Sequence, residues 1–282
     1  MSFWKAIFGG KELTPEEEKK EAEDKNFDLL KYDGIKAMKI GRADYAVRCF
    51  EEALKMRNDL EVRDYLQQVL IRQGDLEGAM SQLEIMTAAE PDNLMLNLQM
   101  AHVAYMMEDY DRMEQICSAL DPNADERVLL MLAQAMLGKN QPEKAIEHLN
   151  TLITNHDDYA DARLLRSKTL LNLGFTDEAD ADAMWLLEFA GGHEDVLLLK
   201  AQVETAKGQQ ETALKLYDMA IEVNPFSAEA FRRRGELYMA MGRTDKAESD
   251  LQQAKELNPE QDNEDIEQQV KQAYKNASPF GV

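Results

Sequence analysis

The chain has 282 residues, and 54 acidic against 32 basic side chains give it a formal net charge of −22. This charge weighs against nucleic acid as a main partner, because phosphate binding requires a basic face. No apolar run is long enough to span a membrane, and the first apolar cluster is too short for a secretory signal. We therefore expect a cytoplasmic protein.

Residues 2–10, SFWKAIFGG, form a short apolar segment that ends in two glycines. Phe3 with Ile7 and Trp4 with Phe8 are i,i+4 pairs, so one helical turn would carry four large apolar groups. Three interpretations stay open. The segment could insert at a membrane interface, dock in a groove of another protein, or fold back on the helices that follow it.

The next stretch predicts the start of a helix. Thr14 is placed to cap it, Pro15 takes the first helical position, and Glu17 completes a capping box. Residues 16–25 have almost no apolar face, which indicates a solvated, charged lead-in.

From Phe27 onward, a unit of two helices recurs in steps of 33, 34, 32, 34, 34 and 34 residues. The units begin at Phe27, Leu60, Leu94, Glu126, Ala160, Glu194 and Ala228. Three columns stay in register through all seven units. A small-residue site in the first helix reads Gly34, Gln67, Ala101, Ala133, Ser167, Ala201 and Gly235. The alanine site in the second helix reads Ala46, Ala79, Met113, Ala145, Ala179, Ala213 and Ala247. The turn between the helices reads Gly41, Gly74, Glu108, Asn140, Gly174, Gly208 and Gly242.

The clearest copy resembles the tetratricopeptide repeat (TPR) pattern of large, small, aromatic, Ala, large and Pro. The residues that carry the resemblance are Phe231, Gly235, Tyr238, Ala247, Leu251, Ala254 and Pro259. Arg234 departs from the pattern, since the family prefers Leu there. The resemblance implies an all-α, right-handed superhelical solenoid of about seven helix-turn-helix repeats with a C-terminal capping helix.

These patterns predict three parts: an amphipathic segment and lead-in at 1–26, the repeat array at 27–260, and a capping helix and tail at 261–282. In the last part, Ile266, Val270 and Tyr274 lie on one apolar stripe. The third repeat deviates most, because it lacks a turn glycine and ends early. We expect looser packing or a changed angle between it and the fourth repeat.

No pattern of catalytic or metal-binding residues is evident. The histidines, His102, His148, His156 and His193, lie in different repeats or connections without i,i+4 pairing, which does not favour a metal site. The two cysteines lie about two repeats apart, too distant for an easy disulfide. We expect no enzyme, no cofactor and no metal.

The resemblance implies that the first helices of the units line a concave groove. The groove residues that it selects are Lys31, Tyr65, Met95, Leu98, His102, Tyr105, Met131, Gln134, Leu165, Lys168, Arg232 and Arg233. The middle of this set is apolar, which suits a flexible peptide-binding surface but is also compatible with ordinary core between repeats. The arginines at its end could receive an acidic segment, or could be neutralised by Glu229, Glu236 or Asp195.

We expect a non-enzymatic scaffold or adaptor that binds a peptide or helix of a partner protein. Two alternatives stay open. One is a self-assembling structural protein that forms homo-oligomers. The other is an accessory factor that is tethered to a membrane peripherally through residues 1–10.

Overall fold

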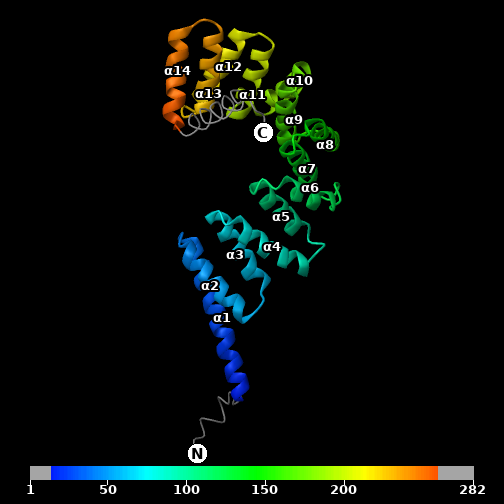
Figure 1. Cartoon of the computed structure of the whole chain (residues 1–282), viewed down its shortest axis with the longest axis vertical. Helices are drawn as coiled ribbons and strands as arrows, with labels where there is room; N and C mark the ends of the chain where they lie inside the picture. The colour runs from blue at the N-terminus through cyan, green and yellow to red at the C-terminus, as the bar shows by residue number, and fades with distance from the viewer. Residues whose placement is uncertain (1–13, 260–282) are drawn as a thin grey trace, which may run out of the picture. The chain divides into compact units, whose positions relative to one another are not determined.

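The computed structural model describes residues 14–259, and these form fourteen helices with no strand (Figure 1). The helices are α1 (Pro15–Lys39), α2 (Ala43–Met56), α3 (Leu60–Gln73), α4 (Leu76–Ala89), α5 (Leu94–Met106), α6 (Tyr110–Ser118), α7 (Glu126–Gly138), α8 (Pro142–Asn155), α9 (Ala160–Asn172), α10 (Thr176–Ala190), α11 (Glu194–Ala206), α12 (Gln210–Val223), α13 (Ala228–Ala240) and α14 (Thr244–Leu257). The all-helical prediction is confirmed.

The chain divides into two compact units, with the boundary between Gln141 and Pro142. Within unit 1, α1 to α7 pack in chain order, each against the next. Within unit 2 the same order holds from α8 to α14, and the last hairpin, α13 with α14, is included (Figure 1). Neighbour-to-neighbour packing is the arrangement of a helical repeat array. The expected solenoid is therefore present in each unit.

The two helix-packing columns of the repeat are buried throughout the described residues. Ala79, Ala145, Ala179 and Ala213 are all 0% exposed, as the repeat requires. Even Met113, the one large residue in that column, is only 1% exposed. The chain accommodates it in the third repeat, where α6 has only nine residues. The early end predicted for this repeat is thus observed.

The turn column adopts one backbone conformation in all seven repeats. Its five glycines have φ between 74° and 83°, and these are joined by Glu108 at 57° and Asn140 at 56°. Left-handed backbone costs glycine little but strains other residues, and asparagine tolerates it better than most. Repeat geometry therefore outweighs local preference at Glu108.

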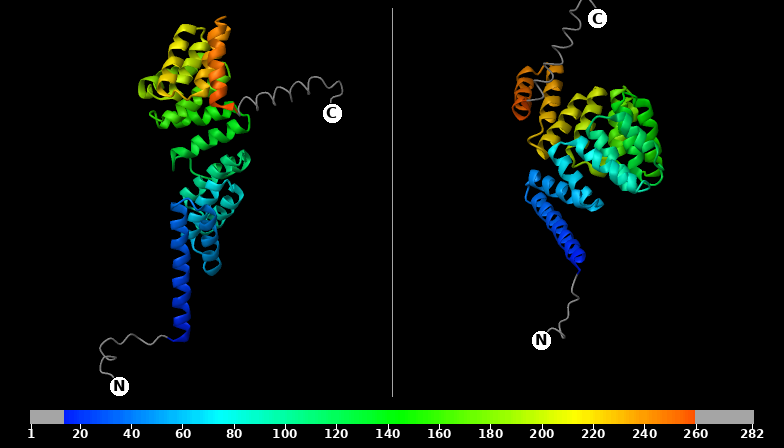
Figure 2. Two further views of the ribbon diagram at one scale, coloured as in Figure 1. Left: turned by 90° about the vertical axis from the view of Figure 1, so that its left-hand side faces the viewer. Right: turned by 60° about the horizontal axis from the view of Figure 1, so that its bottom comes forward.

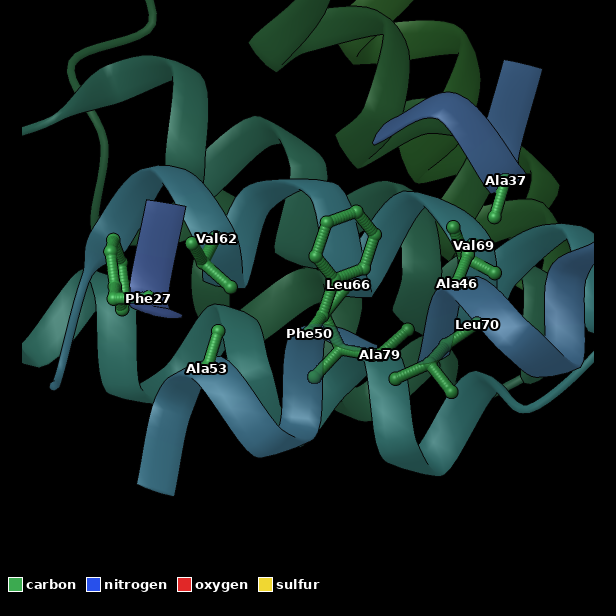
Figure 3. Packing of buried hydrophobic residues seen from close by; sticks show 10 residues of the cluster. All are labelled: Phe27, Ala37, Ala46, Phe50, Ala53, Val62, Leu66, Val69, Leu70 and Ala79. Atoms are coloured by element: carbon green, nitrogen blue, oxygen red, sulfur yellow. The ribbon is translucent and has the colours of Figure 1, made fainter. Parts of the chain in front are cut away.

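The core of unit 1 is continuous across its first hairpins (Figure 3). Figure 3 shows the Phe50 ring among residues of neighbouring helices, and this ring is fully buried. Gly34 faces it so closely that a Cβ on Gly34 would lie 2.5 Å from Phe50 Cε1. The first repeat therefore requires its glycine for the approach of α1 to α2.

Helix α1 is much longer than its partner α2, with 25 residues against 14 (Figure 2). The predicted capping box is present: Thr14 Oγ1 accepts from the Glu17 backbone N–H, and the Thr14 N–H donates to Glu17 Oε2. The charged lead-in and the first helix of the array are one continuous helix. The expected capping helix at 261–282 lies outside the described residues.

In unit 2, charged residues enter the interface between the helices. The Arg234 guanidinium donates to both carboxylate oxygens of Asp250, at 2.7 and 2.8 Å, and to Asp218 on the preceding hairpin. Arg166 makes the same arrangement with Asp182, which is 2% exposed, and with Asn150. These arginines occupy the repeat position where Leu is typical, and both are fully paired there.

Candidate functional site

A depression of about 440 Å³ opens between the first helices of three consecutive repeats in unit 1. We call it the α3–α5–α7 depression. It is lined by Gln67, Gln68, Ile71, Arg72, Met95, Leu98, Gln99, His102, Arg127 and Met131. Four of the predicted groove residues are brought together there, namely Met95, Leu98, His102 and Met131.

The apolar part of the lining has one exposed side chain and one buried one. Met95 is 49% exposed near the start of α5, whereas Leu98 is only 3% exposed. Met131 on α7 and Ile71 on α3 are half-buried. Leu98 thus belongs to the helix packing as well as to the floor of the depression. An unbranched, exposed methionine adapts to different shapes, so Met95 is the side chain best suited to contact a partner.

The polar part of the lining includes two amide oxygens that lack a hydrogen-bond donor. Gln67 is 2% exposed, and its Nε2 donates to Asp64 Oδ1 at 3.1 Å, which fixes the amide orientation. Its Oε1 is buried and receives no hydrogen bond, and the same is true of Gln99 Oε1. Leaving a buried carbonyl oxygen without a donor costs about 1–3 kcal/mol.

The charged residues in the lining are cationic. Arg127, at the start of α7, donates to both oxygens of Asp125 and lies 3.3 Å from Met95 Sδ. This pairing lowers the pKa of Asp125 through the Arg127 side-chain hydrogen bond, although burial opposes the shift. Arg72, by contrast, forms no ion pair with any residue between 14 and 259. No carboxylate lines the depression in this part of the chain.

The groove residues predicted nearer the N-terminus form a separate cluster. Lys31 pairs with Glu61, and Glu61 also accepts from the Tyr65 hydroxyl at 3.2 Å. The Tyr65 ring stacks on Phe50 with 5.8 Å between the centroids. The hydrogen bond to Glu61 and burial both raise the pKa of Tyr65. Burial opposes the charge of Lys31, yet Glu61 and nearby carboxylates leave its pKa raised. The charge of Lys31 is therefore already balanced by a carboxylate of the second repeat.

Two other predicted residues of unit 1 do not line the depression. Tyr105 is 41% exposed and meets the Tyr110 ring edge-on, with centroids 6.2 Å apart. Gln134 is half-buried on α7. Both lie on first helices of their repeats, as the pattern predicts.

In unit 2, the predicted basic spot is paired internally. Glu229 accepts hydrogen bonds from both Arg232 and Arg233, and Glu236 lies within ion-pair distance of both. Burial opposes ionisation of Glu229, but the two arginines hold its pKa below the ordinary value. Of the other two predicted residues, Leu165 is half-buried and Lys168 is exposed. The arginines present far less free positive charge than their number suggests.

The cysteines and the histidines show no arrangement for chemistry. Cys49 and Cys117 are buried, and burial raises the pKa of the Cys117 thiol to about 12, which keeps it protonated at neutral pH. Among residues 14–259 no group of three or more His, Cys, Asp or Glu side chains could hold a metal ion. No helix in that range is both long and apolar enough to cross a bilayer. The proposed anchor residues Phe3, Trp4, Ile7 and Phe8 lie outside the described residues, so that assignment stays a prediction.

Sequence reasoning missed three polar residues of the depression. Gln67 was assigned to the small-residue packing column, and Arg72 and Arg127 were not selected at all. A glutamine in a column otherwise filled by Gly, Ala and Ser was the available signal. A large amide in a small site must extend beyond the helix contact, and here it extends to the groove side.

Comparison with known proteins agrees with this architecture. Models described as "Tetratricopeptide repeat" match residues 127–159 and 228–261, and one described as "TPR repeat" matches residues 201–242. No curated protein sequence matches the chain.

Among solved structures, a tetratricopeptide repeat protein from Parabacteroides merdae is 14% identical. It matches with a TM-score of 0.69 over 83% of this chain and 94% of its own. YrrB, described as a TPR protein with an unusual peptide-binding site, is 19% identical over 66% of this chain and 97% of its own, with a TM-score of 0.49. MamA of MSR-1 is 18% identical over 58% of this chain and 92% of its own, with a TM-score of 0.48. The match to the Parabacteroides merdae protein shows a shared fold. The repeat models show tetratricopeptide repeats at residues 127–159 and 201–261 of this chain.

Proposed function

We propose that this protein is an interaction module that binds a segment of a partner protein in the α3–α5–α7 depression. The observation that carries the proposal is the lining itself. Three consecutive repeats contribute an exposed methionine, apolar side chains and unpaired amide oxygens to one surface. Concave sites that combine an apolar lining with a few polar groups are typical of ligand binding.

The shape of the site favours a peptide segment as its ligand. The depression is open and is built from three helices, so it suits a chain that lies across it. An exposed thioether beside a fixed leucine lets one site accept several apolar side chains. The internally paired arginines of unit 2 offer no comparable combination, which favours unit 1 for the proposed contact.

A random dodecapeptide library displayed on phage provides the test, because it requires no knowledge of the natural partner. Enriched peptides would be synthesised and titrated calorimetrically against the full chain. We expect Met95→Asp with Met131→Asp to weaken binding at least tenfold, because two carboxylates would face the apolar side chain of the peptide.

Met219→Asp is the matched control, since Met219 is 45% exposed on α12 in unit 2. It should change the affinity less than twofold. Met95→Asp alone serves as the milder variant, and circular dichroism checks that all variants keep their helicity. Absence of enrichment, or equal binding by the double variant and the wild type, would overturn the proposal.

A further inference from the structure

We infer that the segment bound in the α3–α5–α7 depression is acidic and apolar: an extended internal stretch with a large apolar side chain next to Asp or Glu. This inference rests on the proposed function and specifies its ligand. Three features of the lining carry it, namely the free cation, the unpaired acceptors and the apolar floor.

The free cation is Arg72. The chain has 54 acidic side chains, so an arginine near carboxylates would normally be paired. Arg112 pairs with Glu84, and Arg127 in the same lining pairs with Asp125. Arg72 has no such partner in residues 14–259 and lies exposed near the end of α3. A guanidinium binds a carboxylate through two parallel hydrogen bonds, which makes Asp or Glu its best ligand.

The net charge of −22 does not prevent this contact. At physiological ionic strength, charges further apart than about 8 Å are largely screened. The charges at the depression itself therefore decide the contact. Among the described residues no carboxylate lines it, and the charge of Asp125 is balanced by Arg127. An incoming carboxylate therefore meets the unpaired guanidinium of Arg72.

The unpaired acceptors define how the backbone of the segment lies. Gln67 Oε1 and Gln99 Oε1 are on neighbouring helices and require donors. The N–H groups of an extended segment supply them, because such a segment keeps its own N–H groups free. Both amides line the same depression as Met95 and Leu98, so we expect a side chain between those N–H groups to contact these apolar residues.

The carboxylate comes from a side chain, not from a chain end. The lining runs from α3 to α7 and has an arginine on each of the two outer helices. A segment that satisfies both Gln67 and Gln99 crosses the depression and continues past it.

The peptide selection described above tests the inference by its sequence outcome. We expect enriched dodecapeptides to share a large apolar residue within two positions of Asp or Glu. Arg72→Glu should weaken these peptides at least tenfold, and exchange of the peptide acid for Lys should restore binding to Arg72→Glu. Arg48→Glu, at an exposed arginine of α2, is the control and should change the affinity less than twofold.

Gln67→Met tests the backbone contact, because it keeps the length of the side chain and removes the amide. The affinity should fall at least fivefold, while the unfolding midpoint should change little, since the lost hydrogen bond to Asp64 is offset by removal of a buried, unpaired oxygen. An ester in place of the relevant peptide N–H should reproduce the loss in the wild type and cause no further loss in Gln67→Met.

The outcomes separate this inference from the proposed function. If the selected peptides are neutral or basic but bind the Met95→Asp, Met131→Asp double variant more weakly, the proposed function is supported and the inference is overturned. The same conclusion follows if acidic peptides bind Arg72→Glu with unchanged affinity. If only peptides with a free C-terminal carboxylate bind, and their amides do not, the internal-segment assignment is overturned. Peptides indifferent to every variant in the depression would overturn both.

Discussion

Units 1 and 2 build the same repeat, but from the second repeat onward they fill one packing position with different chemistry; in the first repeat this position holds Asp33. The seventh position of repeats two to four holds Leu66, Met100 and Leu132, and the same position of repeats five to seven holds Arg166, Lys200 and Arg234. In unit 2 each of these cations is matched by buried or half-buried acceptors: Arg166 by Asp182, Arg234 by Asp250, and Lys200 by Asp180 and Glu204.

The difference shows that a helix-packing site in this fold can hold a charged side chain, provided that a partner of opposite charge is buried beside it. A buried ion pair is seldom more stabilising than a well-packed apolar pair, because removing both charges from water is costly. The apolar and the ionic sites are expected to respond differently to substitution. Removal of one apolar group leaves a cavity, whereas removal of one charge leaves its partner buried and unpaired.

We expect the largest effect from a substitution that removes a buried carboxylate from the ion pairs of unit 2. Asp182 accepts from both Arg163 and Arg166 and is 2% exposed, so Asp182→Asn leaves two guanidinium groups without their counter-charge. We expect the free energy of unfolding of unit 2 to fall by about 3 kcal/mol.

Trp185 provides the measurement, because Arg163 Cζ lies 4.5 Å from the centre of its ring. Urea unfolding would be followed by Trp185 fluorescence in a Trp4→Phe background, which leaves one tryptophan. Glu211→Gln is the matched control in the same unit. Glu211 is 68% exposed in its pair with Arg243, and its loss should change stability by less than about 0.5 kcal/mol. Similar effects of the two substitutions would contradict the comparison.

A second prediction compares the small-residue site in the two units. A Cβ at Gly34 would lie 2.5 Å from the fully buried Phe50 ring, so Gly34→Ala should destabilise unit 1 by about 2 kcal/mol despite the better helix propensity of alanine. At Gly235 the nearest atom is Leu251 Cγ at 2.9 Å, on a half-buried aliphatic side chain that can rotate.

Gly235→Ala should therefore change stability by less than about 1 kcal/mol, because the gain in helix propensity offsets a small adjustment. Thermal unfolding followed by circular dichroism measures both variants. If Gly235→Ala proved more destabilising than Gly34→Ala, the close contact with Phe50 would not be what excludes a larger side chain at Gly34.

The smallest expected effect lies at the turns. Both left-handed residues other than glycine, Glu108 and Asn140, precede the boundary between the units, whereas the left-handed turn residues of unit 2 are glycines. Glu108→Gly should stabilise unit 1 by about 0.5 kcal/mol, since relief of backbone strain exceeds the entropy that glycine adds to the unfolded chain. Denaturant midpoints would reveal the gain. Gly208→Ala is the reverse test and should lose about 1 kcal/mol.

The repeat architecture was predictable from the sequence because each column has a geometric cause. Ala79 and Ala213 recur where helices approach, and Gly41 and Gly242 recur where the backbone turns left-handed. Register across seven copies made these positions visible without any structure.

The polar contacts were harder to predict because they depend on which neighbour a long side chain reaches. Arg234 was noted as a departure from the family pattern and grouped with Arg232 and Arg233 as a basic spot. The structure instead directs it to Asp250 and Asp218, sixteen residues away on either side. Gln67 shows the same limit, since its column indicates packing while its amide lines the depression.

Helix α1 has a mechanical consequence. Its first eight residues, 15–22, extend past the end of α2, where Asp24 pairs with Arg57 and Asn26 contacts Met56. The Thr14 capping box and i,i+4 pairs such as Lys25 with Glu21 hold this stretch helical. At 1.5 Å per residue the stretch is about 12 Å long. Deleting one residue from this stretch would draw anything fused at Thr14 about 1.5 Å nearer and swing it through about 100°. A four-residue deletion would shorten the helix by about 6 Å and nearly restore the direction of the fused partner around the helix axis. The distance and the direction of the partner can therefore be changed separately.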